Sequence, residues 1–196
     1  MLIGGDIMAD DNDKIIHGYK AFNDDHTNRY GVLFEEGMTY KTDGKVSFGV
    51  NSTGGFHMCK NLEDTLRYFI GLENDPVIAE VEGSGDIAEY EDDYNGYYDM
   101  YSVERLKVKR FLSREEMLYT IIDDPLIFDE RVCRFIQGLR MNPAEVELFK
   151  EYFEDSPRVL DALAYYQEGD TEVYNRQYSK DKKRTTKLKW TLFLSL

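Results

Sequence analysis

Short runs in which apolar and polar residues alternate fill the first half of the chain, and this pattern is typical of strands with one buried face. Turn residues separate the runs, so hairpins are the expected connections. The predicted strands cover residues 15–22, 30–34, 38–40, 45–50, 77–81 and 101–108. Gly83-Ser84-Gly85 is expected to be a turn, because it lacks the lysine or third glycine of a phosphate-binding loop.

One helix is predicted among these strands. It begins at Leu62, and Asn61 can cap it because an asparagine side chain accepts a hydrogen bond from an orphan backbone N–H. Leu66 and Phe69 follow Leu62 at helical spacing and extend one apolar stripe. The expected fold class for residues 15–112 is therefore α+β, with a mixed, hairpin-rich β-sheet and one packed helix.

The pattern changes near Ser113, after which apolar residues recur every three or four positions. Four local signals predict helix starts, because each combines a capping side chain with a glutamate or a proline in the first turn. These signals are Ser113 with Glu116, Asp124 with Pro125, Asn142 with Pro143, and Ser156 with Pro157. A small helical subdomain is therefore predicted at residues 113–170.

The tail, residues 171–196, combines positive charge with strict alternation. Arg176 to Leu196 holds seven lysines and arginines against one aspartate. Every second residue from Leu188 to Leu196 is leucine or tryptophan, which predicts a C-terminal strand with one buried face. This strand either completes the chain's own acidic sheet or pairs with another chain, which includes a homodimer formed by strand exchange. The acidic residues 1–14 are predicted to be a disordered leader.

The chain carries a formal net charge of −14, which repels nucleic acid and membrane surfaces and favours a partner with a basic surface. Cys59 and Cys133 lack the spacing of a metal or redox motif and fit a reducing compartment. Residues 1–13 lack the features of a signal peptide, and no run of about 18 apolar residues occurs, so the cytoplasm is the expected location. No metal site is predicted, because Asp24-Asp25-His26 is expected to be a solvated turn.

Five motifs follow one another between residues 15 and 110. They are Gly18-Tyr19-Lys20-Ala21-Phe22, Gly37-Met38-Thr39-Tyr40, Asp43-Gly44, Gly55-Phe56-His57-Met58-Cys59-Lys60-Asn61 and Ala79-Glu80-Val81-Glu82-Gly83-Ser84-Gly85. In this order and spacing they resemble an uncharacterised family that is common in bacteriophages and prophage regions. The resemblance implies a phage or mobile-element gene product that acts inside a bacterial cell.

A more distant resemblance links Gly55-Phe56-His57, and the helix with Tyr68 that follows, to the ADP-ribosyltransferases of the diphtheria-toxin and PARP-like fold. In that fold a His-Gly pair on the first strand holds NAD, and His17-Gly18 occupies such a strand here. The resemblance implies that His17, Gly18 and Tyr68 bind NAD and that Glu104 is the catalytic glutamate. The aromatic residue expected against the nicotinamide is replaced by His57 or displaced to Phe56 or Tyr68.

The acidic segment, defined here as Glu89 to Asp99, is rich in tyrosine and lies between two predicted strands. It is either a solvated loop or a surface that mimics a phosphate backbone and occupies a basic site on a host protein. The residues predicted to bind that partner are Glu89, Glu91, Asp92, Asp93, Tyr94, Tyr97, Tyr98, Asp99 and Tyr101.

The leading prediction is a cytosolic, phage- or prophage-type accessory protein that binds a host protein, for example one of a bacterial defence system, without catalysis and without a cofactor. The first alternative is an NAD-dependent ADP-ribosyltransferase-like enzyme, which would need a cleft between the first strand and the Gly55 strand. The second alternative is a structural or assembly component of a virion.

Overall fold

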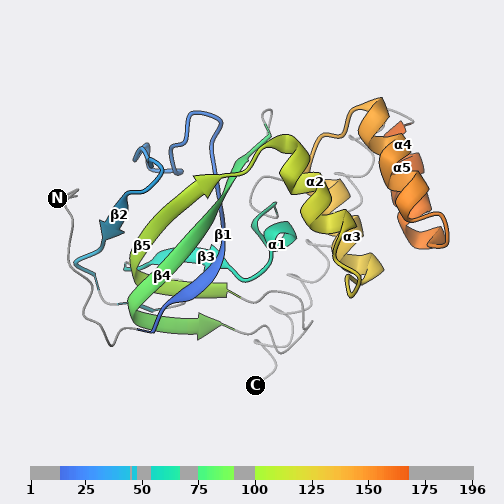
Figure 1. The fold of residues 1–196 in the computed structure, drawn as a ribbon. Coiled ribbons are helices and arrows are strands. Elements are labelled where there is room, and N and C mark those ends of the chain that lie inside the picture. Colours follow the sequence, from blue (N-terminus) through green and yellow to red (C-terminus); the bar gives the residue numbers. More distant parts are fainter. Residues whose placement is uncertain (1–13, 45, 48–53, 67–74, 91–99, 168–196) are drawn as a thin grey trace, which may run out of the picture. The chain divides into compact units, whose positions relative to one another are not determined.

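The computed structural model describes residues 14–44, 46–47, 54–66, 75–90 and 100–167 (Figure 1). The chain divides into two compact units, Met1–Arg140 and Met141–Leu196. Among the described residues, the first unit contains the strands and three helices, and the second contains two further helices. The change of pattern near Ser113 is where strands give way to helices, whereas a separate subdomain at 113–170 stays a prediction.

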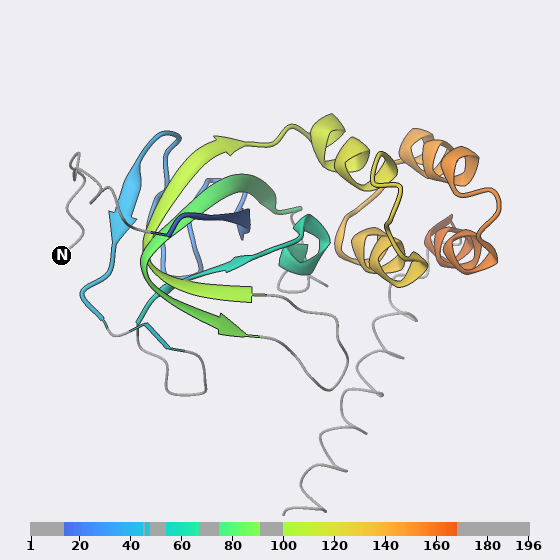
Figure 2. The same ribbon diagram turned by 60° about the horizontal axis from the view of Figure 1, so that its bottom comes forward.

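In the described part of the first unit, five strands form the sheet: β1 (Ile16–Phe22), β2 (Thr39–Lys41), β3 (Phe56–Cys59), β4 (Val77–Tyr90) and β5 (Met100–Phe111). Their order is β2-β5-β3-β1-β4, and β4 also pairs with β5. This last pairing closes β1, β4, β5 and β3 into a small barrel, with β2 added on β5 (Figures 1 and 2). Every pairing among the described strands is antiparallel rather than mixed.

Apolar side chains from all around the barrel fill its interior, as expected for a barrel of few strands. Phe22 and Phe34 belong to this core, with ring centroids 5.0 Å apart and no exposed surface on either residue. The other buried members of this core are Ile16, Met58, Ala79, Val81, Val103, Leu106 and Val108.

The predicted turn at Gly83-Ser84-Gly85 is wrong, because these residues continue β4 to Tyr90. Gly83 faces the core, where a Cβ atom would lie 2.6 Å from Cγ1 of Val103 and 2.9 Å from Sδ of Met58. Gly85 has a φ of +78° at an irregularity of the β4–β5 ladder, a conformation that glycine adopts without strain. These glycines therefore serve interior packing and a bulge.

Three helices accompany the barrel in the first unit: α1 (Leu62–Leu66), α2 (Arg114–Ile122) and α3 (Asp129–Gly138). The predicted capping box of α2 is confirmed, since Oγ of Ser113 accepts from the backbone N–H of Glu116 and Glu116 accepts from the N–H of Ser113. The helix start predicted at Asp124-Pro125 is wrong. Asp124 instead accepts from the N–H of Leu126 at 3.0 Å and closes a turn before α3.

α1 lies between the sheet and the other two helices (Figures 1 and 2). Its Leu62 and Leu66 are fully buried, as are Ile121 of α2 and Phe135 of α3. The packing of α1 against α3 is close, because a Cβ atom on Gly138 would lie 2.5 Å from Cβ of Leu66. The outer side of the sheet and the three helices thus enclose a second apolar layer.

The second unit contains α4 (Pro143–Tyr152) and α5 (Pro157–Gln167). Both predicted helix starts are confirmed, since Asn142 and Glu145 form a capping box and Ser156 accepts from the N–H of Val159. Val146 and Phe149 of α4 and Val159 and Leu163 of α5 are buried. The predicted leader up to residue 13 and the predicted C-terminal strand at 171–196 lie outside the described residues. In the described part of the chain no helix has the length and hydropathy needed to cross a membrane.

Candidate functional site

The acidic segment joins the two longest strands of the barrel. β4 and β5 form a hairpin in which Glu89 lies opposite Tyr101 and Tyr90 lies opposite Met100. Residues 91–99 therefore connect the ends of this hairpin. The predicted partner-binding residues outside the described part are Glu91, Asp92, Asp93, Tyr94, Tyr97, Tyr98 and Asp99.

Glu89 and Tyr101, which lie at the base of the acidic segment, both contact Lys60. Nζ of Lys60, which follows β3, lies 2.7 Å from Oε1 of Glu89 and 5.2 Å from the ring centroid of Tyr101. The hydrogen bond from Lys60 lowers the pKa of Glu89 below its ordinary value. A carboxylate and a tyrosine ring thus share one ammonium group, which is an ion pair combined with a cation–π contact.

The residues predicted to bind NAD and catalyse transfer have other partners. The side chain of His17 is 76% exposed, and its Nδ1 lies 3.7 Å from Oε1 of Glu82. Glu104 accepts from the backbone N–H of Asp86 at 3.2 Å and pairs with Nζ of Lys41 at 3.2 Å. The N–H of Asp86 is the main cause of the lowered pKa of Glu104, and Lys41 adds to it. Glu104 of β5 therefore binds both the bulged part of β4, through Asp86, and β2, through Lys41.

The sheet register keeps His17 and Glu104 apart. His17 pairs with Glu82, and Glu82 pairs with Lys107 of β5. Glu104 lies three residues further along β5, which corresponds to about 10 Å along the strand and two strand spacings across. Tyr68 lies outside the described residues. The transferase alternative stays a prediction, and the described geometry contributes nothing in its favour.

Packing explains the glycine of the His17-Gly18 pair. A Cβ atom at Gly18 would lie 2.3 Å from the carbonyl oxygen of Cys59 and 2.8 Å from Cε of Met58. Both groups belong to β3, which pairs with β1 at Tyr19 and Cys59. Glycine is needed here so that the backbones of β1 and β3 can approach each other.

Lys20 is a residue that the sequence analysis did not identify as chemically unusual. It shares the inward side of β1 with Ile16 and Phe22. Its Nζ donates to the carbonyl oxygen of His57 at 2.7 Å and lies 5.8 Å from the ring centroid of Phe22. Burial lowers the pKa of Lys20 to about 8. The available signal was its even spacing from Ile16 and Phe22 in the predicted strand.

A buried ionic cluster between α1 and α3 also went unnoticed in the sequence. Glu63 and Asp64 are 2% and 1% exposed, and they pair with Nε of Arg131 and Nη1 of Arg134. Burial is the main cause that raises the pKa of Asp64 to about 6, and the neighbouring Glu63 adds to it. The partners lie 68 and 70 positions apart in the sequence, so no local pattern could reveal the pairs.

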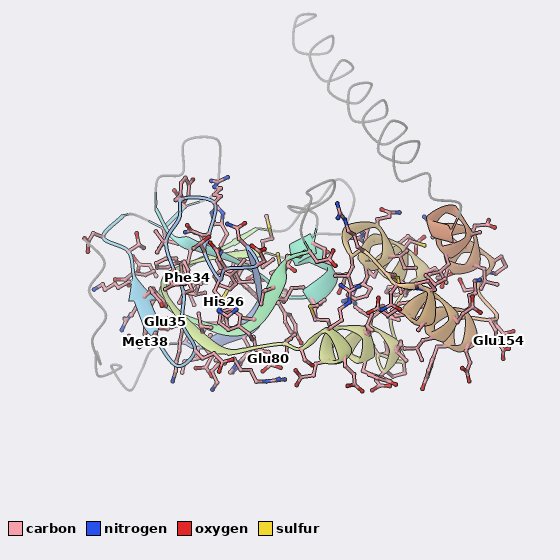
Figure 3. The ribbon with its side chains drawn as sticks, turned by 90° about the horizontal axis from the view of Figure 1, so that it is seen from above. His26, Phe34, Glu35, Met38, Glu80 and Glu154 are labelled. Carbon is pink, nitrogen blue, oxygen red and sulfur yellow. The ribbon has the colours of Figure 1, made fainter. Side chains whose placement is uncertain are left out.

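The side chains of Asp25 and His26 do not converge as the ligands of one metal ion would. Asp25 accepts from the backbone N–H of Thr27 at 3.0 Å and from its hydroxyl at 2.6 Å, and these bonds lower the pKa of Asp25. His26 instead stacks on the ring of Phe111, with centroids 3.9 Å apart, beside the barrel residue Phe34 (Figure 3). Within the described ranges no cluster of three histidine, cysteine or acidic residues could hold a metal ion.

Comparison with known protein families finds a match for most of the first unit. Residues 16–120 match the model of a domain of unknown function, DUF7666, and this range runs from the first residue of β1 into α2. No curated protein and no solved structure matches the chain. The match confirms the expectation of an uncharacterised family, whereas the phage association and the likeness to ADP-ribosyltransferases receive no support from it. Because the matched residues make up more than half of the 196, the chain belongs to the DUF7666 family.

Proposed function

We propose that this protein binds another protein, one with a basic surface, through the acidic segment of the β4–β5 hairpin, and that it does so without catalysis. The supporting observation is Lys60, whose ammonium is shared by Glu89 and Tyr101 at the base of the segment. The same two kinds of side chain recur at residues 91–99. We infer that the carboxylates and tyrosine rings of residues 91–99 bind lysines and arginines of the partner. The contacts would be of the same kinds as those of Lys60, an ion pair and a cation–π contact.

Each such contact is weak alone. An exposed ion pair contributes up to about 1 kcal/mol, and an exposed cation–π contact contributes about 0.5–1 kcal/mol. Micromolar affinity needs about 8 kcal/mol net, so several carboxylates and tyrosines must act together. The sequence supplies them as Glu91, Asp92, Asp93, Tyr94, Tyr97, Tyr98 and Asp99.

The charge of the chain supports the same partner chemistry. Residues 1–175 contain 17 basic and 37 acidic side chains, which gives −20 for this part of the chain. A field of this sign speeds the encounter with a basic surface and rejects nucleic acid. The rate of association should therefore fall as added salt shortens the screening length.

We also propose, from the motif resemblance alone, a phage or prophage origin and action in the cytoplasm of a bacterial host. A host protein whose basic site binds nucleic acid, such as a component of a defence system, has the required surface chemistry. Carboxylates spaced among phenols can occupy such a site in place of phosphates.

The test compares capture of proteins from bacterial lysate by three immobilised full-length chains. The wild type is compared with the triple variant Glu91→Ser, Asp92→Ser and Asp93→Ser, and with the control Glu151→Ser, Glu154→Ser and Asp155→Ser. The control removes the same charge from exposed positions at and after the end of α4, where Glu154 is visible in Figure 3. We expect the hairpin variant alone to lose the captured basic proteins.

Equal capture by the wild type and the hairpin variant would overturn the proposal. Equal loss in both triple variants would show that net charge, and not the hairpin, is responsible. Circular dichroism of each variant checks that the fold is intact.

A further inference from the structure

The barrel strands β1 and β3 are paired at a single position, Tyr19 with Cys59. Among the described residues no further pair follows toward Phe22 at the end of β1 and Phe56 at the start of β3. Phe34, which is labelled in Figure 3, contacts both rings, with centroids 5.0 Å from Phe22 and 6.2 Å from Phe56. The seam between β1 and β3 is therefore closed here by side chains and not by a ladder of backbone hydrogen bonds.

Lys20 crosses this seam from β1 to β3. Its Nζ donates to the backbone carbonyl oxygen of His57 at 2.7 Å and lies 5.8 Å from the ring centroid of Phe22. Lys20 is only partly buried, so solvent reaches part of the residue. The amine therefore lies against apolar groups of the barrel without the whole residue being enclosed.

Lys20 differs from other lysines of the chain in its electrostatic environment. In the part of the chain that the structure describes, no carboxylate forms an ion pair with Lys20. Four other lysines each lie within 3.2 Å of a carboxylate oxygen: Lys41, Lys60, Lys109 and Lys150. A carboxylate stabilises an ammonium, whereas an apolar environment disfavours the charge. The uncharged amine is therefore more accessible to Lys20 than to the four paired lysines.

The groups around Lys20 act on its pKa in both directions. Burial has the largest effect and lowers the pKa, the thiol of Cys59 on β3 raises it, and the guanidinium of Arg29 in the loop after β1 lowers it. The resulting pKa is about 8. Part of the Lys20 population is therefore uncharged, and nucleophilic, near neutral pH.

We propose that the amine of Lys20 is a covalent binding site for small uncharged aldehydes, with which it forms an imine. The amine nitrogen bonds to the carbonyl carbon of the aldehyde, and both amine hydrogens leave with the aldehyde oxygen as one molecule of water. Lysine amines in apolar surroundings are suited to this reaction, because it starts from the uncharged form. A protonated imine keeps one N–H, which can still donate to the carbonyl oxygen of His57.

The charge of the chain favours an uncharged electrophile. Acyl phosphates also react with amines, but they are anions, and a net charge of −14 repels them. A small aldehyde carries no charge and needs little room beside the backbone of β3 and the ring of Phe22. This proposal does not rest on partner binding by the acidic segment, because Lys20 lies on another strand and contacts none of its residues.

The test is trace labelling of the full-length wild-type protein at pH 7. Acetaldehyde is the probe, and cyanoborohydride reduces each imine to a stable ethylamine. Peptide mass spectrometry then measures the rate of ethylation at each lysine. Lys109 and Lys150 are internal controls, because each is partly exposed and paired with a carboxylate. The same labelling of the chain unfolded in guanidinium chloride is the second control, because unfolding removes the seam.

At pH 7 about one in ten Lys20 amines is uncharged, against fewer than about one in a thousand for an ordinary lysine. Restricted access and the weaker nucleophilicity of a less basic amine reduce this advantage. We therefore expect Lys20 to be ethylated at least about tenfold faster than Lys109 and Lys150 in the folded protein, and at a similar rate in the unfolded chain.

Ethylation of Lys20 at the same rate as the two controls, or more slowly, in the folded protein would overturn the proposal. A preference for Lys20 that persists after unfolding would also overturn it, because the neighbouring sequence and not the seam would then be the cause. The labelling involves no partner protein, so its outcome is independent of the capture experiment.

Discussion

Lys20 places a cationic group at the inner side of a barrel strand. Part of the residue is reachable by solvent, but its ammonium lies between the carbonyl of His57 and the ring of Phe22. Burial therefore lowers the pKa of Lys20 from 10.5 to about 8. Because the unfolded chain binds more protons between these two values, the free energy of unfolding rises with pH across that window.

Replacing Lys20 by methionine should remove this rise. The wild type is expected to gain about 3 kcal/mol from Lys20 between about pH 8 and pH 10.5, and Lys20→Met should gain correspondingly less. Urea unfolding at several pH values measures the difference. Lys109→Met, on the outer side of the same sheet, is the control and should keep the rise. Parallel pH profiles for Lys20→Met and the wild type would contradict the prediction.

Gly18 offers a second test, because packing and not cofactor binding explains it here. In Gly18→Ala the added Cβ would meet the backbone of β3, which cannot move as a flexible side chain can. The expected loss of unfolding free energy is about 3 kcal/mol or more. Gly37→Ala is the matched control, since Gly37 has a φ of +77° and open space around it, so only local strain of about 1 kcal/mol is added. Similar urea midpoints for the two variants would refute this account.

Two carboxylates of α1, Glu63 and Asp64, are almost fully removed from water where α1 contacts α3. The pKa of Asp64 is about 6 in the folded chain and 3.8 in its ordinary state. The folded state therefore binds more protons between these values, and stability falls as the pH rises through about 6. Arg134 and Arg131 offset part of the cost of charging Asp64.

Asp64→Asn should flatten this dependence. Between about pH 4 and pH 7 the wild type should lose about 3 kcal/mol that the variant does not lose. Asp75→Asn is the control, because Asp75 is a partly exposed carboxylate that pairs with Arg114 at 2.8 Å, and the loss should persist there. Chemical denaturation across this pH range measures both. A profile for Asp64→Asn that still falls as steeply as that of the wild type would contradict the assignment.

Local signals predicted the element ends that depend on neighbouring residues alone. The caps at Ser113, Asn142 and Ser156 were correct, because the capping side chain and the N–H that it accepts lie within three residues. Asp124-Pro125 carried the same signal, but Asp124 also suits a turn, and the pattern does not distinguish the two. The end of β4 was missed because glycines within a strand resemble a turn in sequence.

Long-range pairing could not be predicted from the sequence. The closure of the barrel by β4 and β5 depends on twist and bulges, and a hydrophobic pattern only predicts that each strand has a buried face. The pairs Glu63–Arg131 and Asp64–Arg134 join distant positions for the same reason. For the candidate site, the sequence alone indicated that the acidic segment could bind a basic partner. The contacts of Lys60 with Glu89 and Tyr101 became visible only in the structure.

The division of the chain into two compact units has a measurable consequence. Phe149 is fully buried in α4 beside Phe153, with ring centroids 5.6 Å apart. Phe149→Ala should cost about 3–5 kcal/mol, which is more than two short helices are expected to sustain. We expect faster amide exchange throughout α4 and α5, with protection of the barrel strands unchanged.

The reciprocal variant completes this test. Phe135→Ala removes an equally buried ring from α3 of the first unit and should leave exchange in α4 and α5 unchanged. If each variant accelerated exchange in both units, the chain would unfold as one cooperative body and the prediction would be wrong.

The place of β5 in the sheet determines when the barrel can form during synthesis. β5 pairs with β2, β3 and β4, and without it β3 has only β1 as a described neighbour. The ring of strands therefore cannot close before Phe111 has left the ribosome. At about 5–20 residues per second, synthesis from Gly83 to Phe111 takes about 1–6 s, and during this time β1 and β4 can pair while the rest of the ring is open. During that interval the apolar side chains of the barrel interior would be exposed and accessible to a chaperone.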